Sequence, residues 1–168
     1  VDFGLRLDPL SLTFVLLMGF MLRPVLDPQG MLSPHGVRSV SRVHQDHAYS
    51  ITIGSQTFTL EYAPGESTTP LFGGNSNWRG PVWFPLNYLL IEALQKHDAV
   101  LGGAFAVECP TGSGQEMTLW QVSTELTRRL IAIFARDENG RRAVHGDREK
   151  FQSDPHWRDL IPFHEYFH

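Results

Sequence analysis

The sequence predicts a mainly α-helical fold in which long loops separate the helices. Two segments, 81–97 and 117–136, repeat apolar residues at a spacing near 3.6, which is typical of amphipathic helices. A third segment, 10–22, is strongly apolar. The stretches between them are rich in glycine, proline and polar residues. Helices joined by long loops fit an α-toroid better than a tight bundle, because such loops need a broad face on which to build a site.

The composition is that of one globular domain. Of 168 residues, 42% are apolar and 19% are charged, which is enough for a hydrophobic core. The net charge is −4 and the basic residues are scattered, so we expect no nucleic-acid partner. Cys109 is the single cysteine, so no internal disulfide can form, and we expect this thiol to be buried and the chain to be cytoplasmic.

The apolar segment 10–22 predicts a buried helix. It is shorter than the roughly 18 residues that a membrane span requires, so we expect no membrane partner. Asp2, Arg6 and Asp8 precede it in place of a cationic start, and no small-residue cleavage site follows it. The segment is therefore not predicted to be a signal peptide.

The next part of the chain predicts loops around one β-hairpin. Residues 24–47 are punctuated by prolines and glycines and predict a long structured loop. Residues 49–53 and 57–62 alternate with a period of two around Gly54-Ser55, which predicts the hairpin. Residues 63–79 predict another loop.

The second half predicts the two amphipathic helices and the start of a third. Pro81 suits the first turn of the helix over 81–97, although Pro85 could occupy that turn instead. After a loop over 102–115, Thr118 is the expected N-cap of the helix over 117–136, with Gln121 completing a capping box. Residues 146–155 predict a polar loop and residues 157–168 the beginning of a helix.

The run from Phe72 to Pro85 is the most informative part of the sequence. Trp78 and Trp83 can stack on the C–H face of a pyranose, and the polar side chains between residues 75 and 79 can bind its hydroxyl groups. The alternative is an ordinary glycine-rich loop that leads into a helix, with both tryptophans anchored in the core. The residues alone leave both interpretations open.

Residues 75–83, Asn-Ser-Asn-Trp-Arg-Gly-Pro-Val-Trp, resemble the signature of glycoside hydrolase family 63, including its bacterial glucosidase-like and mannosylglycerate hydrolase-like members. Further blocks resemble the family in the same order, so that the resemblance covers roughly residues 21–168 and leaves 1–20 outside. These blocks are Leu32–Ser41, Pro64–Ser67, Asn87–Leu94, Val107–Gly114, Phe151–Asp159 and Phe163–His168.

The resemblance implies that residues 1–168 are part of an (α/α)6-barrel catalytic domain. It implies hydrolysis of α-glucosidic or α-mannosidic bonds with inversion, an oligosaccharide or small glycoside as substrate, and no cofactor. Eight acidic residues are candidates for the chemistry: Glu61, Glu66, Glu92, Glu108, Glu116, Asp154, Asp159 and Glu165. The resemblance selects Glu165 as the general base. It implies a substrate-binding wall formed by Arg38, Glu66, Asn75, Asn77, Trp78, Arg79, Pro81 and Trp83.

Arg38 and Glu66 could equally be ordinary loop residues whose side chains stabilise turns. The family's general acid is an aspartate in a motif like Ser-Gly-x-Asp-x-Ser, which this sequence lacks. Family members also continue beyond the last block, and this chain starts with valine. We therefore expect a fragment that is inactive alone. The alternative is a non-catalytic carbohydrate-binding helical module or pseudoenzyme.

A zinc metallohydrolase is a remote alternative. Residues 164–168, His-Glu-Tyr-Phe-His, match H-E-x-x-H, in which two histidines one helical turn apart bind zinc. Pro162 lies just before the motif, and a third ligand would have to come from the other histidines. We therefore expect no metal.

Overall fold

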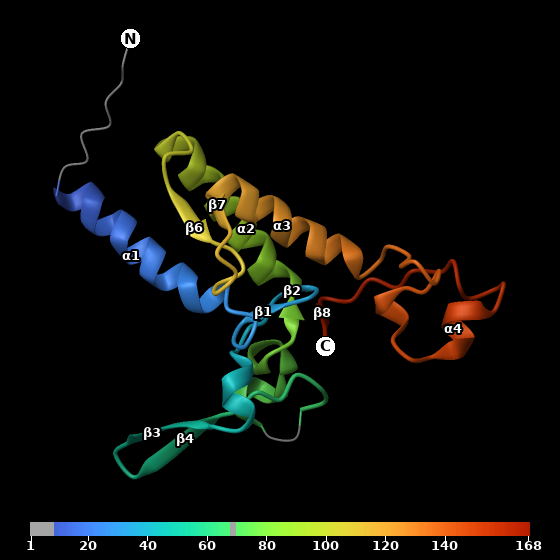
Figure 1. Cartoon of the computed structure of the whole chain (residues 1–168). Coiled ribbons are helices and arrows are strands. Elements are labelled where there is room, and N and C mark those ends of the chain that lie inside the picture. The colour runs from blue at the N-terminus through green and yellow to red at the C-terminus, as the bar shows by residue number, and fades with distance from the viewer. Residues whose placement is uncertain (1–8, 68–69) are drawn as a thin grey trace.

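The computed structural model describes residues 9–67 and 70–168 (Figure 1). Its helices are α1 (Pro9–Val25), α2 (Phe84–Leu101), α3 (Leu119–Ala132) and the short α4 (Glu149–Ser153). Its strands form four two-stranded antiparallel ribbons. These are β1 (Leu32–Ser33) with β2 (Gly36–Val37), β3 (Tyr49–Ile53) with β4 (Gln56–Leu60), β5 (Val82–Trp83) with β8 (Tyr166–Phe167), and β6 (Ala106–Glu108) with β7 (Glu116–Thr118).

The fold is therefore a small α+β arrangement, and the predicted section of an (α/α)6 barrel is wrong. In such a barrel each helix packs against neighbouring helices. Here α2 and α3 pack on each other, whereas α1 reaches them through the β6–β7 ribbon, which α1 contacts at β6 and α3 contacts at β7. Residues 102–115 were expected to be a loop, but residues 106–108 within them form β6, whose backbone groups pair with β7 at 116–118.

Helix α2 begins three residues later than predicted. Pro85 lies in its first turn, where a missing N–H costs nothing, and Pro81 lies in the preceding loop. Gly102 ends the helix with a φ of 61°, a left-handed conformation that glycine adopts without strain. Asn87, in the first turn of α2, is a polar residue that is fully buried.

Helix α3 confirms its predicted N-terminus. The Thr118 hydroxyl accepts a hydrogen bond from the Gln121 N–H, and the Gln121 side chain accepts one from the Thr118 N–H. Its buried face holds Leu119, Val122, Ser123, Leu126 and Leu130. The helix ends at Ala132, before the predicted Arg136, because residues 133–136 turn to meet the segment that follows.

The core lies between α1, α2, α3 and the β1–β2 ribbon. Its buried apolar side chains are Leu22, Leu26, Leu32, Val37, Leu94, Cys109, Leu119, Val122 and Leu126. Burial raises the pKa of the Cys109 thiol, as expected of a small core residue. A second cluster of Val82, Leu130 and Ile133, with Phe84, Phe134 and Phe167 packed against it, underlies the β5–β8 ribbon.

The β3–β4 hairpin is confirmed at its predicted position. It turns at Gly54, which has a φ of 63°, and it extends away from the rest of the molecule (Figure 1). On one face Ser50 bonds Thr59 and Thr52 bonds Thr57, with oxygen separations of 2.9 and 3.0 Å. It is one of four ribbons in the described part of the chain, not the single hairpin that was expected.

Two expectations about the chain ends differ from the structure. The helix predicted over 10–22 is present as α1, but it is not buried all round, since Leu16, Leu17, Phe20 and Met21 are exposed while Leu22 faces the core. The predicted C-terminal helix is wrong: residues 166–167 form β8, because their backbone pairs with β5. Residues 1–8, which open the stretch 1–20 that falls outside the family resemblance, lie outside the described residues. Within the described ranges, no helix has the length and apolarity to cross a bilayer.

Candidate functional site

The β5–β8 ribbon brings Glu165 next to the Asn-Trp-Arg-Gly-Pro run. Val82 pairs with Phe167 and Trp83 pairs with Tyr166. One residue beyond this register, the Phe84 N–H donates to the Glu165 carbonyl at 3.0 Å. Backbone pairing therefore fixes the position of Glu165 against residues that lie more than eighty positions earlier in the chain.

The carboxylate of Glu165 is held through one oxygen. Its Oε1 accepts hydrogen bonds from Asn77 Nδ2 at 3.0 Å and from the Trp83 indole Nε1 at 2.7 Å. No described residue donates a hydrogen bond to Oε2, and Glu165 is exposed. An anchored carboxylate with a free, solvent-facing oxygen can accept a proton from a water molecule.

Trp78 and Trp83 form an aromatic corner beside this carboxylate. Their ring centroids are 4.4 Å apart at an interplanar angle of 69°, an edge-to-face contact. Trp83 is anchored through its bond to Glu165, whereas Trp78 keeps 46% of its surface exposed. The corner thus presents an aromatic surface to solvent within reach of a polar group, which is what a sugar ring requires.

A 3₁₀-helix over Ser76–Arg79 sets the direction of these side chains. Asn75 is its N-cap, and the Asn75 Oδ1 accepts a hydrogen bond from the Asn77 N–H at 2.8 Å. Gly80 ends it with a φ of 121°, and a Cβ at this position would lie 2.3 Å from Tyr62 Cδ2. Glycine is therefore required there by both conformation and space.

Arg79 and Pro81 lie beneath the surface. Arg79 is 5% exposed, and its Nη1 donates to the Ser67 hydroxyl at 3.0 Å. The Pro81 carbonyl accepts a hydrogen bond from the Ser39 N–H at 3.0 Å. Of the predicted wall, Asn77, Trp78 and Trp83 therefore meet at Glu165, Asn75 supports them as a cap, and Arg79 and Pro81 hold the loop from below.

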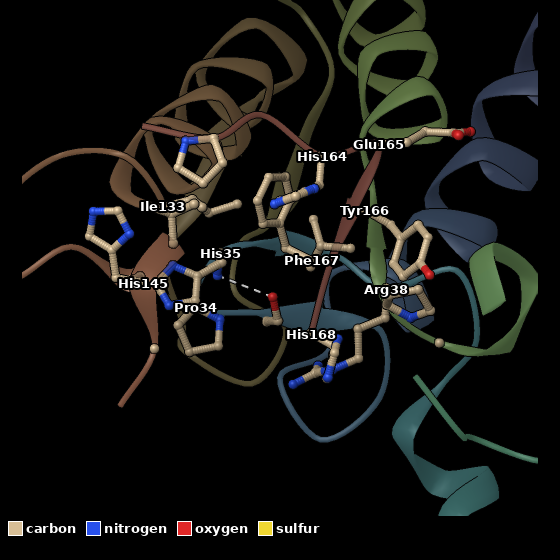
Figure 2. A pocket seen from close by; sticks show the side chains of 18 of the residues that line it. Pro34, His35, Arg38, Ile133, His145, His164, Glu165, Tyr166, Phe167 and His168 are labelled. Atoms are coloured by element: carbon tan, nitrogen blue, oxygen red, sulfur yellow. Dashed lines mark hydrogen bonds between the residues drawn. The ribbon is translucent and has the colours of Figure 1, made fainter. Parts of the chain in front are cut away.

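Arg38 and Glu66 line a cavity of about 850 Å³ that Glu165 also borders. Figure 2 shows that the Glu165 side chain points away from the histidines of this cavity. The cavity histidines are His35, His145, His164 and His168, of which the sequence indicated His164 and His168 only as ligands in the zinc alternative. His35, His164 and His168 lie within the family-like blocks, which was the available signal. Burial, and then the nearby charge of Arg129, lower the pKa of His35, so its ring is neutral near pH 7.

The zinc motif does not have the conformation that it needs. H-E-x-x-H binds metal when a helix aligns its two histidines on one face, but residues 166–167 between them are a strand. Among the described residues, no group of three or more histidine, cysteine or carboxylate side chains is arranged to hold a metal ion. Residues 164–168 therefore do not form the helical zinc-binding motif.

The chain is similar to a Saccharomyces cerevisiae protein named "Uncharacterized protein YMR196W". The two are 48% identical over 149 residues, which is 88% of this chain and 14% of the yeast protein. The chain thus spans about one seventh of the length of that curated relative. No family model matches the chain. No solved structure matches it.

Proposed function

We propose that the surface around Glu165 is a glycoside-binding site and that Glu165 is the general base of an inverting α-glycosidase similar to glycoside hydrolase family 63. One observation carries the proposal: Glu165, the residue that the resemblance selects, accepts hydrogen bonds from Asn77 and Trp83 of the signature run. The substrate class is an α-linked glucoside or mannoside, and the complete activity belongs to a protein that also supplies a general acid.

The geometry suits the chemistry of a base. Inverting hydrolysis needs a carboxylate that takes a proton from water while the water attacks the anomeric carbon. The two neutral donors on Oε1 fix the Glu165 carboxylate without neutralising it, and Oε2 is left to receive the proton. The exposed face of Trp78 offers a stacking surface for the sugar ring beside the attacking water.

Binding is tested by titrating the 168-residue chain with methyl α-glucoside and methyl α-mannoside while tryptophan fluorescence is recorded. We expect saturable binding that Trp78→Ala weakens by about tenfold or more, because the stacking surface is lost. Trp120→Ala is the matched control, since Trp120 is 54% exposed and lies on α3. Equal effects of the two substitutions, or no saturable binding, would contradict the proposal.

The role of Glu165 as a base is tested with α-glucosyl and α-mannosyl fluoride. Fluoride leaves without needing a strong general acid, so hydrolysis of these substrates depends mainly on the base and on binding. We expect fluoride release above the spontaneous rate, a β-configured product, and loss of both in Glu165→Gln with sugar binding retained. Release that is unchanged in Glu165→Gln would eliminate this assignment.

A non-catalytic carbohydrate-binding module is the second candidate. The observation that favours it is the Trp78–Trp83 corner, which can hold a sugar whether or not Glu165 reacts. Sugar binding without fluoride release would support this module over the hydrolase.

A further inference from the structure

The cavity behind the β5–β8 ribbon is a separate feature from the exposed face of Glu165. Glu165 borders it, but the Glu165 Oε1 is engaged by Asn77 and Trp83, and its side chain points away from the cavity histidines (Figure 2). The cavity walls come from the β1–β2 ribbon, from residues 143–151 and from the last residues of the chain. At about 850 Å³ it is within the range of small-molecule sites.

A buried arginine lines this cavity without a carboxylate partner. Arg38 is 9% exposed, and its Nη1 donates to the carbonyl oxygens of Gly30 and Leu32 at 3.3 and 2.7 Å. Among the ion pairs of residues 9–67 and 70–168, none includes Arg38. Buried charges in proteins are normally paired, and the remaining guanidinium donors of Arg38 suit an oxyanion.

Two histidines on the same cavity carry unsatisfied nitrogens. His145 is 5% exposed, and its Nε2 is buried without a hydrogen-bond partner among the described residues. His35 Nδ1 has the same status, although the His35 backbone N–H bonds the Ser33 hydroxyl at 3.1 Å (Figure 2). A polar ligand would supply the partners that these ring nitrogens lack.

The other lining groups define the size and charge of the ligand. Arg148 adds a second cation at an exposed position, and Glu66 is an exposed carboxylate. Apolar side chains of Ile133, Val144 and Phe151 complete the wall. A cation, imidazole rings and an apolar wall together fit a small organic molecule with one anionic group.

We propose that this cavity binds the oxyanion, phosphate or carboxylate, of an organic molecule of about monosaccharide size, with Arg38 and Arg148 as the cationic partners and His35 and His145 as hydrogen-bonding partners. This site is independent of the role of Glu165, so either proposal can hold without the other.

The test is calorimetric titration of the 168-residue chain with four probes: glucose 6-phosphate, glucuronate, inorganic phosphate and glucose. We expect saturable binding of glucose 6-phosphate or glucuronate, with the tighter of the two identifying the oxyanion, and weaker binding of inorganic phosphate, which lacks the organic part. The titrations are repeated with Trp78→Ala, which removes the proposed stacking surface near Glu165, and there glucose should bind at least about tenfold more weakly than the preferred anion. Binding of glucose to Trp78→Ala as tightly as that anion, or no saturable binding of either organic anion, would overturn the proposal.

Charge-reversal variants distinguish anion binding in this cavity from non-specific attraction of the anion to positively charged side chains on the surface. Arg148→Glu should weaken binding of the preferred anion by about tenfold or more, because a rim cation becomes an anion. Arg42→Glu is the matched control: Arg42 is exposed and does not line the cavity. It should leave the affinity within about twofold. Equal losses in both variants would overturn the proposal.

A histidine variant tests the interior of the cavity. His145→Phe preserves an aromatic ring that can stack on Phe151, whose centroid is 5.9 Å away, but removes the unsatisfied nitrogen. Folding of the variant is checked by circular dichroism. We expect a folded chain with several-fold weaker anion binding, and an unchanged affinity in the folded variant would count against the site.

Discussion

Two buried asparagines show how differently the interior and the candidate site of this molecule are built. Asn87 in α2 is fully buried and makes three hydrogen bonds: its Oδ1 accepts from the Val37 N–H, and its Nδ2 donates to the carbonyls of Val37 and Trp83, all at 2.8 to 2.9 Å. Asn77 is 3% exposed, yet its Oδ1 has no partner among the described residues. Its Nδ2 bonds the exposed carboxylate of Glu165.

The hydrogen bonds of the two asparagines differ because Asn87 supports the fold and Asn77 belongs to the candidate site. Asn87 connects β2 to the first turn of α2 through hydrogen bonds, and all polar atoms of its side chain have partners. Its role is therefore structural. Asn77 directs its donor to a side chain at the surface and keeps an unused acceptor beneath it. Polar groups that a fold leaves unsatisfied are more common where a ligand acts than in a supporting interior.

Asn87→Ala should produce the largest effect. It leaves the backbone N–H and carbonyl of Val37 buried without partners, at a cost of about 4 kcal/mol in the free energy of unfolding. Urea unfolding followed by circular dichroism measures the cost. Leu126→Ala is a useful reference, since it removes fully buried apolar atoms and should cost about 3 kcal/mol. A cost below about 1 kcal/mol for Asn87→Ala would remove the basis of the comparison.

Gly80→Ala should have the next largest effect and acts on the loop of the candidate site. The added methyl group would overlap the Tyr62 ring, and the φ of 121° is strained for alanine. We expect a loss of about 3 kcal/mol in unfolding free energy together with weaker sugar binding. Gly112→Ala is the control, because its φ of 87° carries the conformational cost while nothing lies near its Cβ. A loss no larger than in Gly112→Ala would show that Tyr62 does not fix this loop.

Asn77→Ala should have a small effect on stability and a larger effect on glycoside binding, the opposite of what is expected for Asn87→Ala. It removes one hydrogen bond and an unsatisfied oxygen, so we expect a cost of about 1 kcal/mol or less in unfolding free energy. The same variant should weaken glycoside binding several-fold, because the Glu165 carboxylate loses a fixed donor. Parallel urea unfolding and fluorescence titration provide the measurements. A stability loss as large as that of Asn87→Ala would erase the distinction between the two asparagines.

Glu125→Gln should have the smallest effect, and a pH-dependent one. Hydrogen bonds from Arg128 and Arg129, at 2.8 Å each, hold the pKa of Glu125 below its usual value. A lowered carboxyl pKa contributes stability that is complete above the unfolded-state pKa and is lost as the pH falls through the folded-state pKa. The wild-type chain should therefore exceed the variant by about 1 kcal/mol or less at pH 7, and the difference should shrink below about pH 4. Unfolding at both pH values checks this, and a difference that grows in acid would have the wrong sign.

Local patterns in the sequence predicted the local structure well. The capping box at Thr118 and the hairpin around Gly54 depend on residues a few positions apart, and both are confirmed. The β5–β8 ribbon depends on pairing between distant residues, and no period or turn signal announces a two-residue strand. The resemblance suggested an (α/α)6 barrel, and the ribbons among the helices overturned it.

The candidate site was predictable in part. Aromatic and amide residues in one short run indicated Trp78, Trp83 and Asn77, and the resemblance indicated Glu165. The capping role of Asn75 and the burial of Arg79 follow from the 3₁₀-helix, which has no clear sequence period. The grouping of His35, His145, His164 and His168 around one cavity was not predicted, since their proximity arises from segments far apart in the chain.

The spacing of the Glu165 contacts also has a consequence for the order of folding. Glu165 follows Asn77 by 88 residues and Trp83 by 82, so the ribosome must complete a long stretch of chain before these groups can meet. The helix pair of α2 and α3 is joined by the short β6–β7 ribbon and can form from local contacts first. During synthesis, α2 and α3 of a nascent chain can therefore pack on each other before Glu165 has been added to the chain.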